Sequence, residues 1–187
     1  NDFDLERLEE ISNKFNCDLE IMIRFTPGIE CHTHEYIRTG SFDSKFGFGI
    51  EYLNTLFSKI NTTKHLKLTG LHAHIGSQIF ELEPHKDLGE IMVNIISEAK
   101  NFGHDIKKLN VGGGLGIKYT ENDDPPSIDE WVKIISSSVV NACKKHNLDL
   151  PTLMCEPGRS IVSTAGVTIY KIGAFKEIPG VRTYLSV

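Results

Sequence analysis

The sequence predicts an α/β fold with a parallel sheet, arranged as one half of an eight-stranded (β/α) barrel. Short apolar segments typical of strands alternate with amphipathic helical segments along the 187 residues, and this alternation favours parallel strands joined by right-handed crossovers. Polar residues and glycines follow the carboxyl end of every predicted strand, which is where barrel enzymes build their active sites. A whole barrel has eight strands and takes about 250 residues. The four parallel strands predicted here therefore fit half of a barrel. A small doubly wound sheet is the alternative.

The first third of the chain predicts a helix, a strand and a long loop. Leu5, Leu8, Ile11 and Phe15 follow helical spacing and predict an amphipathic helix over residues 4–15. Alternating apolar residues then predict a strand over residues 19–25 with one buried face. After the turn at residues 26–28, residues 29–46 form a long polar loop, and loops of this length are usually functional or mobile.

The middle of the chain predicts two strands and three helices. Apolar residues at helical spacing predict helices over residues 50–60 and from Pro84 to Phe102, the second ended by Gly103. A capping box, Ser127 with Glu130, predicts the start of a third helix. The strands between these helices are expected over residues 66–74 and 106–111.

The last part of the chain predicts a short strand followed by a more β-rich tail. The strand covers residues 152–155 and leads into Glu156-Pro157-Gly158-Arg159. Residues 167–174 and 181–187 are expected to be strands flanking a turn at residues 178–180.

Composition excludes several classes of protein. The net charge is -5 and no block of Lys and Arg occurs, so no nucleic-acid partner is expected. The apolar stretches are too short to span a bilayer, and residues 1–4 lack the layout of a signal peptide. The four cysteines are scattered without a CxxC pair, which fits a reducing cytosol. Residues 31–34 (Cys-His-Thr-His) have no second ligand pair at zinc-like spacing, so no metal is expected.

The three glycines Gly112, Gly113 and Gly114 are the clearest candidate anion site. Successive glycines allow backbone N–H groups to converge on a phosphate without obstruction by a Cβ atom. The alternative is a simple flexible turn. The spacing matches neither the Rossmann nor the Walker pattern, so a nucleotide site of those kinds is not predicted.

Two histidines on one predicted strand form the second candidate. His72 and His74 are two residues apart, so both side chains point to the same face of the sheet. His74 lies nearer the end of the strand, where Gly76 and Ser77 add a second turn able to hold a phosphate. These neighbours favour a functional role for His74, whereas His72 is interpreted as structural.

Glu156 and Arg159 form the third candidate, and two interpretations are open. They could form a structural ion pair with each other. Alternatively, Glu156 faces a ring nitrogen, because a carboxylate beside a pyridine stabilises the protonated ring that withdraws electrons from a substrate. Arg159 suits bidentate recognition of a phosphate or a substrate carboxylate.

Taken together, these motifs resemble those of a known enzyme family. His74-Ile75-Gly76-Ser77-Gln78, residues 112–116 (Gly-Gly-Gly-Leu-Gly) and Glu156-Pro157-Gly158-Arg159 resemble, in this order, the pyridoxal-phosphate-dependent decarboxylases with an alanine-racemase-like barrel. Residues 33–40 with residues 44–47, and Gln78 after Gly76-Ser77, resemble the branch that acts on diaminopimelate. The resemblance extends from about Leu19 to the end of the chain.

The resemblance implies a reaction and its catalytic residues. The implied reaction removes carbon dioxide from the D-centre of meso-diaminopimelate and gives L-lysine. His74 would stack on the pyridine ring of pyridoxal 5'-phosphate, and Glu156 would pair with the ring nitrogen. The protonated ring would accept the electrons left on the substrate carbon.

The resemblance also implies how the rest of the cofactor is held. Ser77 and the amides of Gly113 and Gly114 would bind the phosphate. Gly158 and Arg159 would line the phosphate and substrate side, with Arg159 also a candidate for contact with the substrate.

The chain departs from the family pattern in ways that suggest a piece of a longer polypeptide. The family's Schiff-base lysine lies upstream of this sequence, and Lys45 belongs to a different motif. The family's catalytic Cys and a substrate-side Tyr lie in a carboxyl-terminal β-domain. Residues 1–166 are therefore interpreted as the second half of the barrel, and residues 167–187 as strands leading into that β-domain. This piece alone is expected to be inactive. Because it has two unpaired sheet edges, it is expected either to self-associate edge to edge or to occur only with the remainder of its chain.

Three alternatives stay open. Another decarboxylase of the same fold would act on ornithine, arginine or carboxynorspermidine, and the loop around Arg38 is where such a difference is expected. A racemase of the same barrel belongs to this first alternative. The second is of a different class, a non-catalytic protein that binds pyridoxal phosphate. The third is a structural barrel fragment without a ligand. The full-length protein is expected to be a cytoplasmic homodimer.

Overall fold

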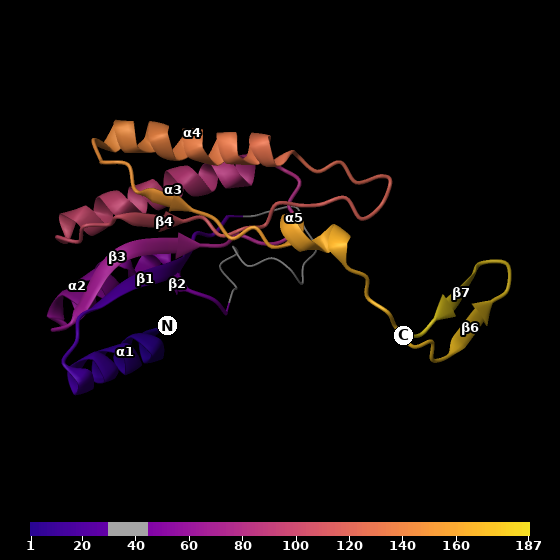
Figure 1. Cartoon of the computed structure of the whole chain (residues 1–187), viewed down its shortest axis with the longest axis horizontal. Coiled ribbons are helices and arrows are strands. Elements are labelled where there is room, and N and C mark those ends of the chain that lie inside the picture. The colour runs from indigo at the N-terminus through magenta and orange to yellow at the C-terminus, as the bar shows by residue number, and fades with distance from the viewer. Residues whose placement is uncertain (30–44) are drawn as a thin grey trace.

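A five-stranded parallel sheet is the centre of the computed structural model, which describes residues 1–29 and 45–187 (Figure 1). The strand order is β2-β1-β3-β4-β5. Strands β1, β3, β4 and β5 therefore lie side by side in chain order, and the short β2 lies at the edge beside β1. The bounds are β1 (Leu19–Thr26), β2 (Phe48–Gly49), β3 (Leu66–Ala73), β4 (Lys108–Asn110) and β5 (Thr152–Met154).

Helices connect these strands, as a parallel sheet requires. They are α1 (Asp2–Phe15), η2 (Ile50–Tyr52), α2 (Leu53–Thr62), α3 (Glu83–Asn101), α4 (Ile128–His146), α5 (Arg159–Val162) and η3 (Ser163–Ala165). Lys59 of α2 forms ion pairs with Asp2 and Glu6 of α1, and α3 packs along α4 (Figure 1). Neighbouring helices thus contact each other on one side of the sheet, which favours the barrel over a doubly wound sheet.

The helix ends follow from the local sequence. The side chains of Ser127 and Glu130 cap each other's backbone N–H groups at the start of α4, which confirms the predicted capping box. Asn1 and Asp4 form a second capping box at α1, so this helix begins two residues earlier than predicted. Asn147 ends α4 in the left-handed conformation.

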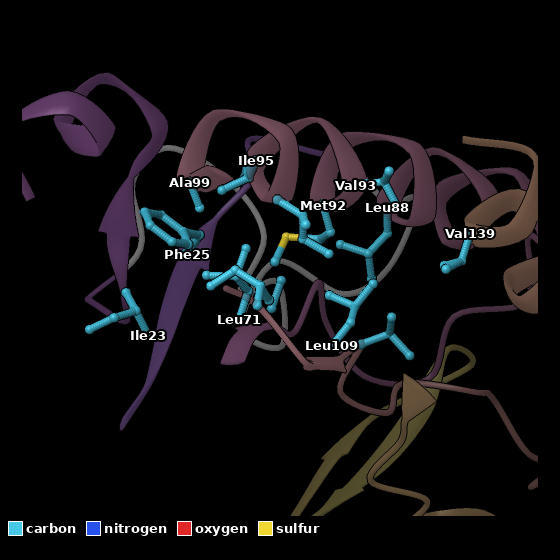
Figure 2. Packing of buried hydrophobic residues seen from close by; sticks show 14 of the residues in the cluster. Ile23, Phe25, Leu71, Leu88, Met92, Val93, Ile95, Ala99, Leu109 and Val139 are labelled. Atoms are coloured by element: carbon cyan, nitrogen blue, oxygen red, sulfur yellow. The ribbon is translucent and has the colours of Figure 1, made fainter. Parts of the chain in front are cut away.

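The hydrophobic core lies between the sheet and the helices. Phe25 of β1, Leu71 of β3 and Leu109 of β4 are each 0% exposed and lie beneath α3, whose Met92 and Ala99 are also 0% exposed (Figure 2). The opposite face of β3 carries His72, which is only partly buried. Alternation along the strand therefore directs apolar side chains to the helices and leaves the polar ones for the other face.

The strands differ from the prediction in two places. The short β2 pairs with Phe25 and Thr26 of β1 and was not predicted, because two residues are too few to give a periodic signal. Residues 167–174 are not a strand, and the strand predicted there lies instead at β6 (Phe175–Ile178). β6 pairs with β7 (Arg182–Leu185) in a separate antiparallel hairpin (Figure 1).

Some predictions fall on residues that the structure does not describe. They are the larger part of the loop over residues 29–46, the cysteine and histidines of residues 31–34, the motif at residues 33–40 and the loop around Arg38. In the described part of the chain, none of the helices has the length and apolar character needed to cross a membrane.

Candidate active site

The carboxyl ends of β3, β4 and β5 meet around one cavity of ≈ 300 Å³. All seven predicted cofactor-binding residues line it: His74, Ser77, Gly113, Gly114, Glu156, Gly158 and Arg159. Its apolar walls come from residues that follow β4 and from the start of α4 and α5: Leu115, Ile128, Trp131, Val132 and Ile161. The three motifs, far apart in sequence, therefore converge as predicted.

The triple glycine is needed because neighbouring strand ends pack closely against it. A Cβ atom on Gly112 would lie 2.7 Å from Nδ1 of His74, and one on Gly114 would lie 2.5 Å from the carbonyl oxygen of Gly76. A Cβ atom on Gly113 would overlap the carbonyl oxygen of Glu156. The Glu156 amide also donates to the Gly112 carbonyl, at 2.7 Å. The turn is thus a packed junction between strand ends, not a flexible connection.

The amides of this turn have different partners. The Gly112 N–H donates to Oδ1 of Asn110 at 2.9 Å, and the Gly113 N–H donates to Nδ1 of His74 at 3.2 Å. Among the described residues the Gly114 N–H has no acceptor, so it is the amide that a bound anion can use. The role predicted for the Gly113 amide in holding a phosphate stays a prediction.

Glu156 is held by one of its two carboxylate oxygens. Asn110 donates a hydrogen bond from Nδ2 to Oε1 at 2.9 Å, and Nε2 of His72 lies 3.5 Å from the same oxygen. The Glu156 side chain is 51% exposed and lines the cavity. The ion pair with Arg159, one of the two interpretations above, does not form, because Arg159 has other partners.

The surroundings favour the neutral form of His72 in β3 and of His74 just after this strand. Burial lowers the pKa of His74, and the positive charge of Arg24 lowers it further, against the opposing effect of Glu156. Burial likewise lowers the pKa of His72, although the Glu156 carboxylate opposes this. Nδ1 of His74 accepts a hydrogen bond from Gly113, so the proton of the neutral ring is on Nε2.

Arg159 is fixed by two hydroxyl groups. Its Nε donates to Oγ of Ser77 at 2.8 Å, and its Nη1 donates to the Tyr119 hydroxyl at 2.7 Å. The guanidinium also lies over the Tyr119 ring, with Cζ 5.9 Å from the ring centroid. Among the described residues Nη2 has no acceptor, which leaves it for an anionic ligand.

Gln78 joins the segments that carry Ser77 and Tyr119. Its side-chain amide pairs with both backbone groups of Ile117, at 2.6 Å to the carbonyl oxygen and 3.2 Å from the N–H. Gln78 has φ 60°, which is uncommon for a residue other than glycine and typical of functional sites. The clamp fixes the backbone two residues before Tyr119 and so helps to set the position of its hydroxyl.

Three residues of this site were missed from the sequence alone: Arg24, Asn110 and Tyr119. Asn110 lies near the end of a predicted strand, two residues before the triple glycine. A polar residue at this position is a signal that could have identified it. Tyr119 lies in the loop that follows the triple glycine, where no periodicity predicts the direction of its side chain. Arg24 lies on the partly buried face of the alternating strand β1, where the pattern alone does not distinguish it from a solvated charge.

The family of the chain follows from comparison with known proteins. Residues 1–163 match the model of the pyridoxal-dependent decarboxylases, specifically their pyridoxal binding domain. The chain belongs to this family. Its cofactor is pyridoxal phosphate.

Relatives with curated names are similar to the chain over nearly its whole length. A diaminopimelate decarboxylase of Synechocystis sp. is 52% identical over 98% of the chain and 39% of its own length. One of Staphylococcus aureus is 42% identical over 98% of the chain and 43% of its own length. The chain thus spans about two fifths of the length of these relatives.

A solved structure has the same fold. The diaminopimelate decarboxylase of Helicobacter pylori in complex with L-lysine aligns with a TM-score of 0.80 and 29% identity, covering 98% of this chain and 44% of that one. The parallel sheet described above is therefore part of a decarboxylase barrel, which confirms the predicted fold.

The residues around the cavity fit pyridoxal phosphate. The Arg159 guanidinium, the Gly114 amide and the Ser77 hydroxyl form a set of groups suited to a phosphate. The half-exposed Glu156 carboxylate, which lines the same cavity, suits a protonated pyridine nitrogen. The apolar walls suit the ring between them.

Proposed function

We propose that the complete protein decarboxylates meso-diaminopimelate to L-lysine with pyridoxal phosphate as its cofactor. The observation that carries the proposal is the convergence of Glu156, His74 and two residues of the triple glycine, Gly113 and Gly114, on one cavity. The relatives named diaminopimelate decarboxylase support the substrate, and so does the L-lysine in the Helicobacter pylori complex, because lysine is the product of the proposed reaction.

The residues of this chain would contribute charge, position and exclusion of water. Pyridoxal phosphate bound in this cavity would supply an electron sink for the substrate carbon that loses carbon dioxide. Glu156 would hold a proton at the ring nitrogen. His74, whose pKa is lowered by burial, would stack on the ring without adding a positive charge that opposes this proton. The apolar walls, including Trp131 and Leu115, exclude water and strengthen these interactions.

The phosphate would be held at the opposite side of the cavity. We assign this role to Ser77, Gly113, Gly114, Gly158 and Arg159. Arg159 can also reach toward a substrate carboxylate, because Nη2 has no acceptor among the described residues. Residues that hold the phosphate in this way would also help to orient the cofactor toward Glu156.

The experiment is an assay of carbon dioxide release by the complete protein with pyridoxal phosphate and a panel of amino acids. We expect meso-diaminopimelate to be decarboxylated with kcat/KM at least 100-fold (roughly 2.7 kcal/mol) above ornithine, arginine and carboxynorspermidine, on the order of the discrimination that a polar site achieves. A preference for one of the other substrates would replace the assignment, and cofactor binding without turnover would indicate a carrier protein.

Three further proposals concern the whole protein. We infer that it is a homodimer, that it lies in the cytoplasm, and that residues 167–187 lead from the barrel into a carboxyl-terminal β-domain. The bacterial relatives support the location, and the antiparallel β6–β7 hairpin supports the β-domain. Sedimentation of the complete protein tests the dimer, and a monomer at micromolar concentration would contradict it.

A further inference from the structure

We propose that Asn110 is a positioning residue that fixes Glu156 and the triple-glycine turn relative to each other. This inference rests on the function proposed above and concerns how the site is held together. Asn110 is the last residue of β4, between His72 of β3 and Met154 of β5 in register. It is 8% exposed, so its side-chain amide lies in the sheet and has little access to water.

The side-chain amide of Asn110 uses both of its ends. Its Oδ1 accepts from the Gly112 N–H at 2.9 Å, and its Nδ2 donates to Oε1 of Glu156 at 2.9 Å. The direction of this chain of hydrogen bonds is fixed, because a backbone N–H can only donate. Asn110 must therefore present its oxygen to Gly112 and its NH₂ group to Glu156.

A consequence follows for the carboxylate. Oε1 of Glu156 accepts the hydrogen bond from Asn110, and this bond is stronger when the carboxylate is ionised than when that oxygen carries a proton. The nearby Nε2 of His72, 3.5 Å away, has no hydrogen-bond partner among the described residues. Asn110 is thus the neutral donor that orients Glu156, and it leaves the second oxygen for the ring nitrogen of the cofactor.

The same side chain sets the start of the phosphate-binding turn. Gly112 has φ 69°, in the left-handed region that favours glycine. Oδ1 of Asn110 accepts a hydrogen bond from the Gly112 N–H and so helps to hold the turn in this conformation. Because one rigid amide joins the turn to Glu156, the two ends of the cofactor site cannot shift independently. This arrangement supplies the preorganisation that an electrostatic site needs.

The test compares two substitutions in the complete protein. Asn110→Asp keeps an acceptor for the Gly112 N–H, but it removes the donor to Glu156 and places a like charge beside it. Asn110→Ala removes both hydrogen bonds. For either variant we expect the Kd for pyridoxal phosphate, measured by equilibrium dialysis, to rise roughly 10- to 100-fold, as for loss of a hydrogen bond to a charged group.

A matched control and a double mutant separate positioning from a general structural role. Asn61 donates from Nδ2 to the Phe102 carbonyl at 2.8 Å, far from the cavity, so Asn61→Asp makes the same chemical change elsewhere. We expect it to leave the Kd unchanged. In a Glu156→Ala background, Asn110→Asp should have no further effect on the Kd, because its partner is gone.

Kinetics give a readout that loss of stability alone would not move. Asn110 does not line the cavity, so Asn110→Asp should lower kcat while the KM for diaminopimelate stays within about twofold. An unchanged Kd in both Asn110 variants, or an equal effect with and without Glu156, would overturn the inference. Failure of the unmodified protein to bind pyridoxal phosphate would instead overturn the proposed function. If Asn110→Asp does not fold, Asn110→Ala decides the result.

Discussion

The two ends of the parallel sheet differ in how completely their polar groups are paired. At the amino end, Asp18 accepts from Nδ1 of His65 at 2.9 Å and also pairs with Lys67. Lys108 of β4 pairs with Glu20 of β1 at 3.1 Å, across the intervening strand β3. These groups are mostly exposed and have partners of opposite charge, so this end is arranged for solubility and modest stability.

Most buried side-chain atoms without a hydrogen-bond partner among the described residues gather at the carboxyl end, and Nε2 of His146, at the far end of α4, is the exception. Nε2 of His72 and both ring nitrogens of His85 have no hydrogen-bond partner among the described residues. His85 is 0% exposed and lies edge-on against Trp131, with the ring centroids 5.6 Å apart. Burial lowers the pKa of His85 to about 4, with a further contribution from His74.

The contrast shows which end of the sheet carries function. A buried polar group without a partner costs stability, so such groups persist where they serve another purpose. The same strands therefore carry paired charges at one end and a neutral, incompletely paired set around the cavity at the other. Substitutions at each end test this difference.

The largest effect is expected from Gly113→Ala at the carboxyl end. The added Cβ atom would overlap the Glu156 carbonyl oxygen, and backbone cannot move aside as a side chain can. We expect a loss of roughly 2–3 kcal/mol in the free energy of unfolding, as for overpacking, measured by urea denaturation. Gly166→Ala is the control, because nothing lies within 4 Å of its Cβ position. Equal losses in both variants would contradict the close packing of strand ends.

The second prediction concerns His85 and pH. The folded protein binds a proton at His85 only near pH 4, whereas the unfolded chain binds it near the ordinary value of about 6.5. The unfolded state therefore gains protons first as the pH falls, and stability is lost between these two values. From pH 7 to pH 5 we expect this group to cost about 2 kcal/mol.

Substitution isolates this effect. His85→Phe keeps an aromatic ring against Trp131 and should flatten the decline in unfolding free energy below pH 6.5. Near the amino end of the sheet, Nε2 of His104 has a hydrogen-bond partner, because it lies 3.2 Å from the carbonyl oxygen of Phe57. We expect His104→Phe to reduce stability at pH 7, whereas His85→Phe should not. The reverse order would contradict the comparison of the two ends.

A smaller effect is expected from Tyr119→Phe. The change removes only the hydroxyl that accepts from Nη1 of Arg159, so the guanidinium is less well fixed toward the phosphate. We expect the Kd for pyridoxal phosphate to rise about three- to tenfold, in line with one partly exposed hydrogen bond. Tyr184→Phe provides the control, since Arg182 lies at the same 5.9 Å from its ring centroid outside the site. An effect of equal size there would count against Tyr119.

The smallest effect is expected from Asp18→Asn at the amino end. The hydrogen bond from Lys67, and then that from His65, lowers the pKa of Asp18 to about 2. Its contribution is present above the ordinary value of about 3.9 and is lost as the pH falls toward 2. Because the group is exposed and screened, we expect Tm to fall by only about 1–2 °C at pH 7. The Kd for pyridoxal phosphate should not change, and a clear rise would show that the two ends are coupled.

Most of the fold could be predicted from the sequence because its signals are local. The alternating residues of β1, the capping box at Ser127 and the glycine after α3 each determine an element through nearby residues. The error at residues 167–174 has the opposite cause. An apolar run predicts a strand, but a strand also needs a partner, and the β6–β7 pairing begins at Phe175 and Leu185.

The site could be predicted only as far as its motifs extend. Glu156, His74 and Arg159 follow strands directly, so parallel pairing brings them to one edge. His72 was interpreted as structural, yet it lies 3.5 Å from Glu156. Asn110 and Tyr119 act through side-chain hydrogen bonds between elements, and no periodicity or spacing in the sequence predicts those.

The central claim is that Glu156 faces the ring nitrogen of the cofactor in this cavity. The most direct measurement is the ¹⁵N NMR chemical shift of the ring nitrogen of labelled pyridoxal phosphate bound to the complete protein near pH 7.5. We predict a protonated nitrogen in the unmodified protein and an unprotonated one in Glu156→Gln. An unprotonated nitrogen in the unmodified protein, or the same shift in both proteins, would contradict the site described here.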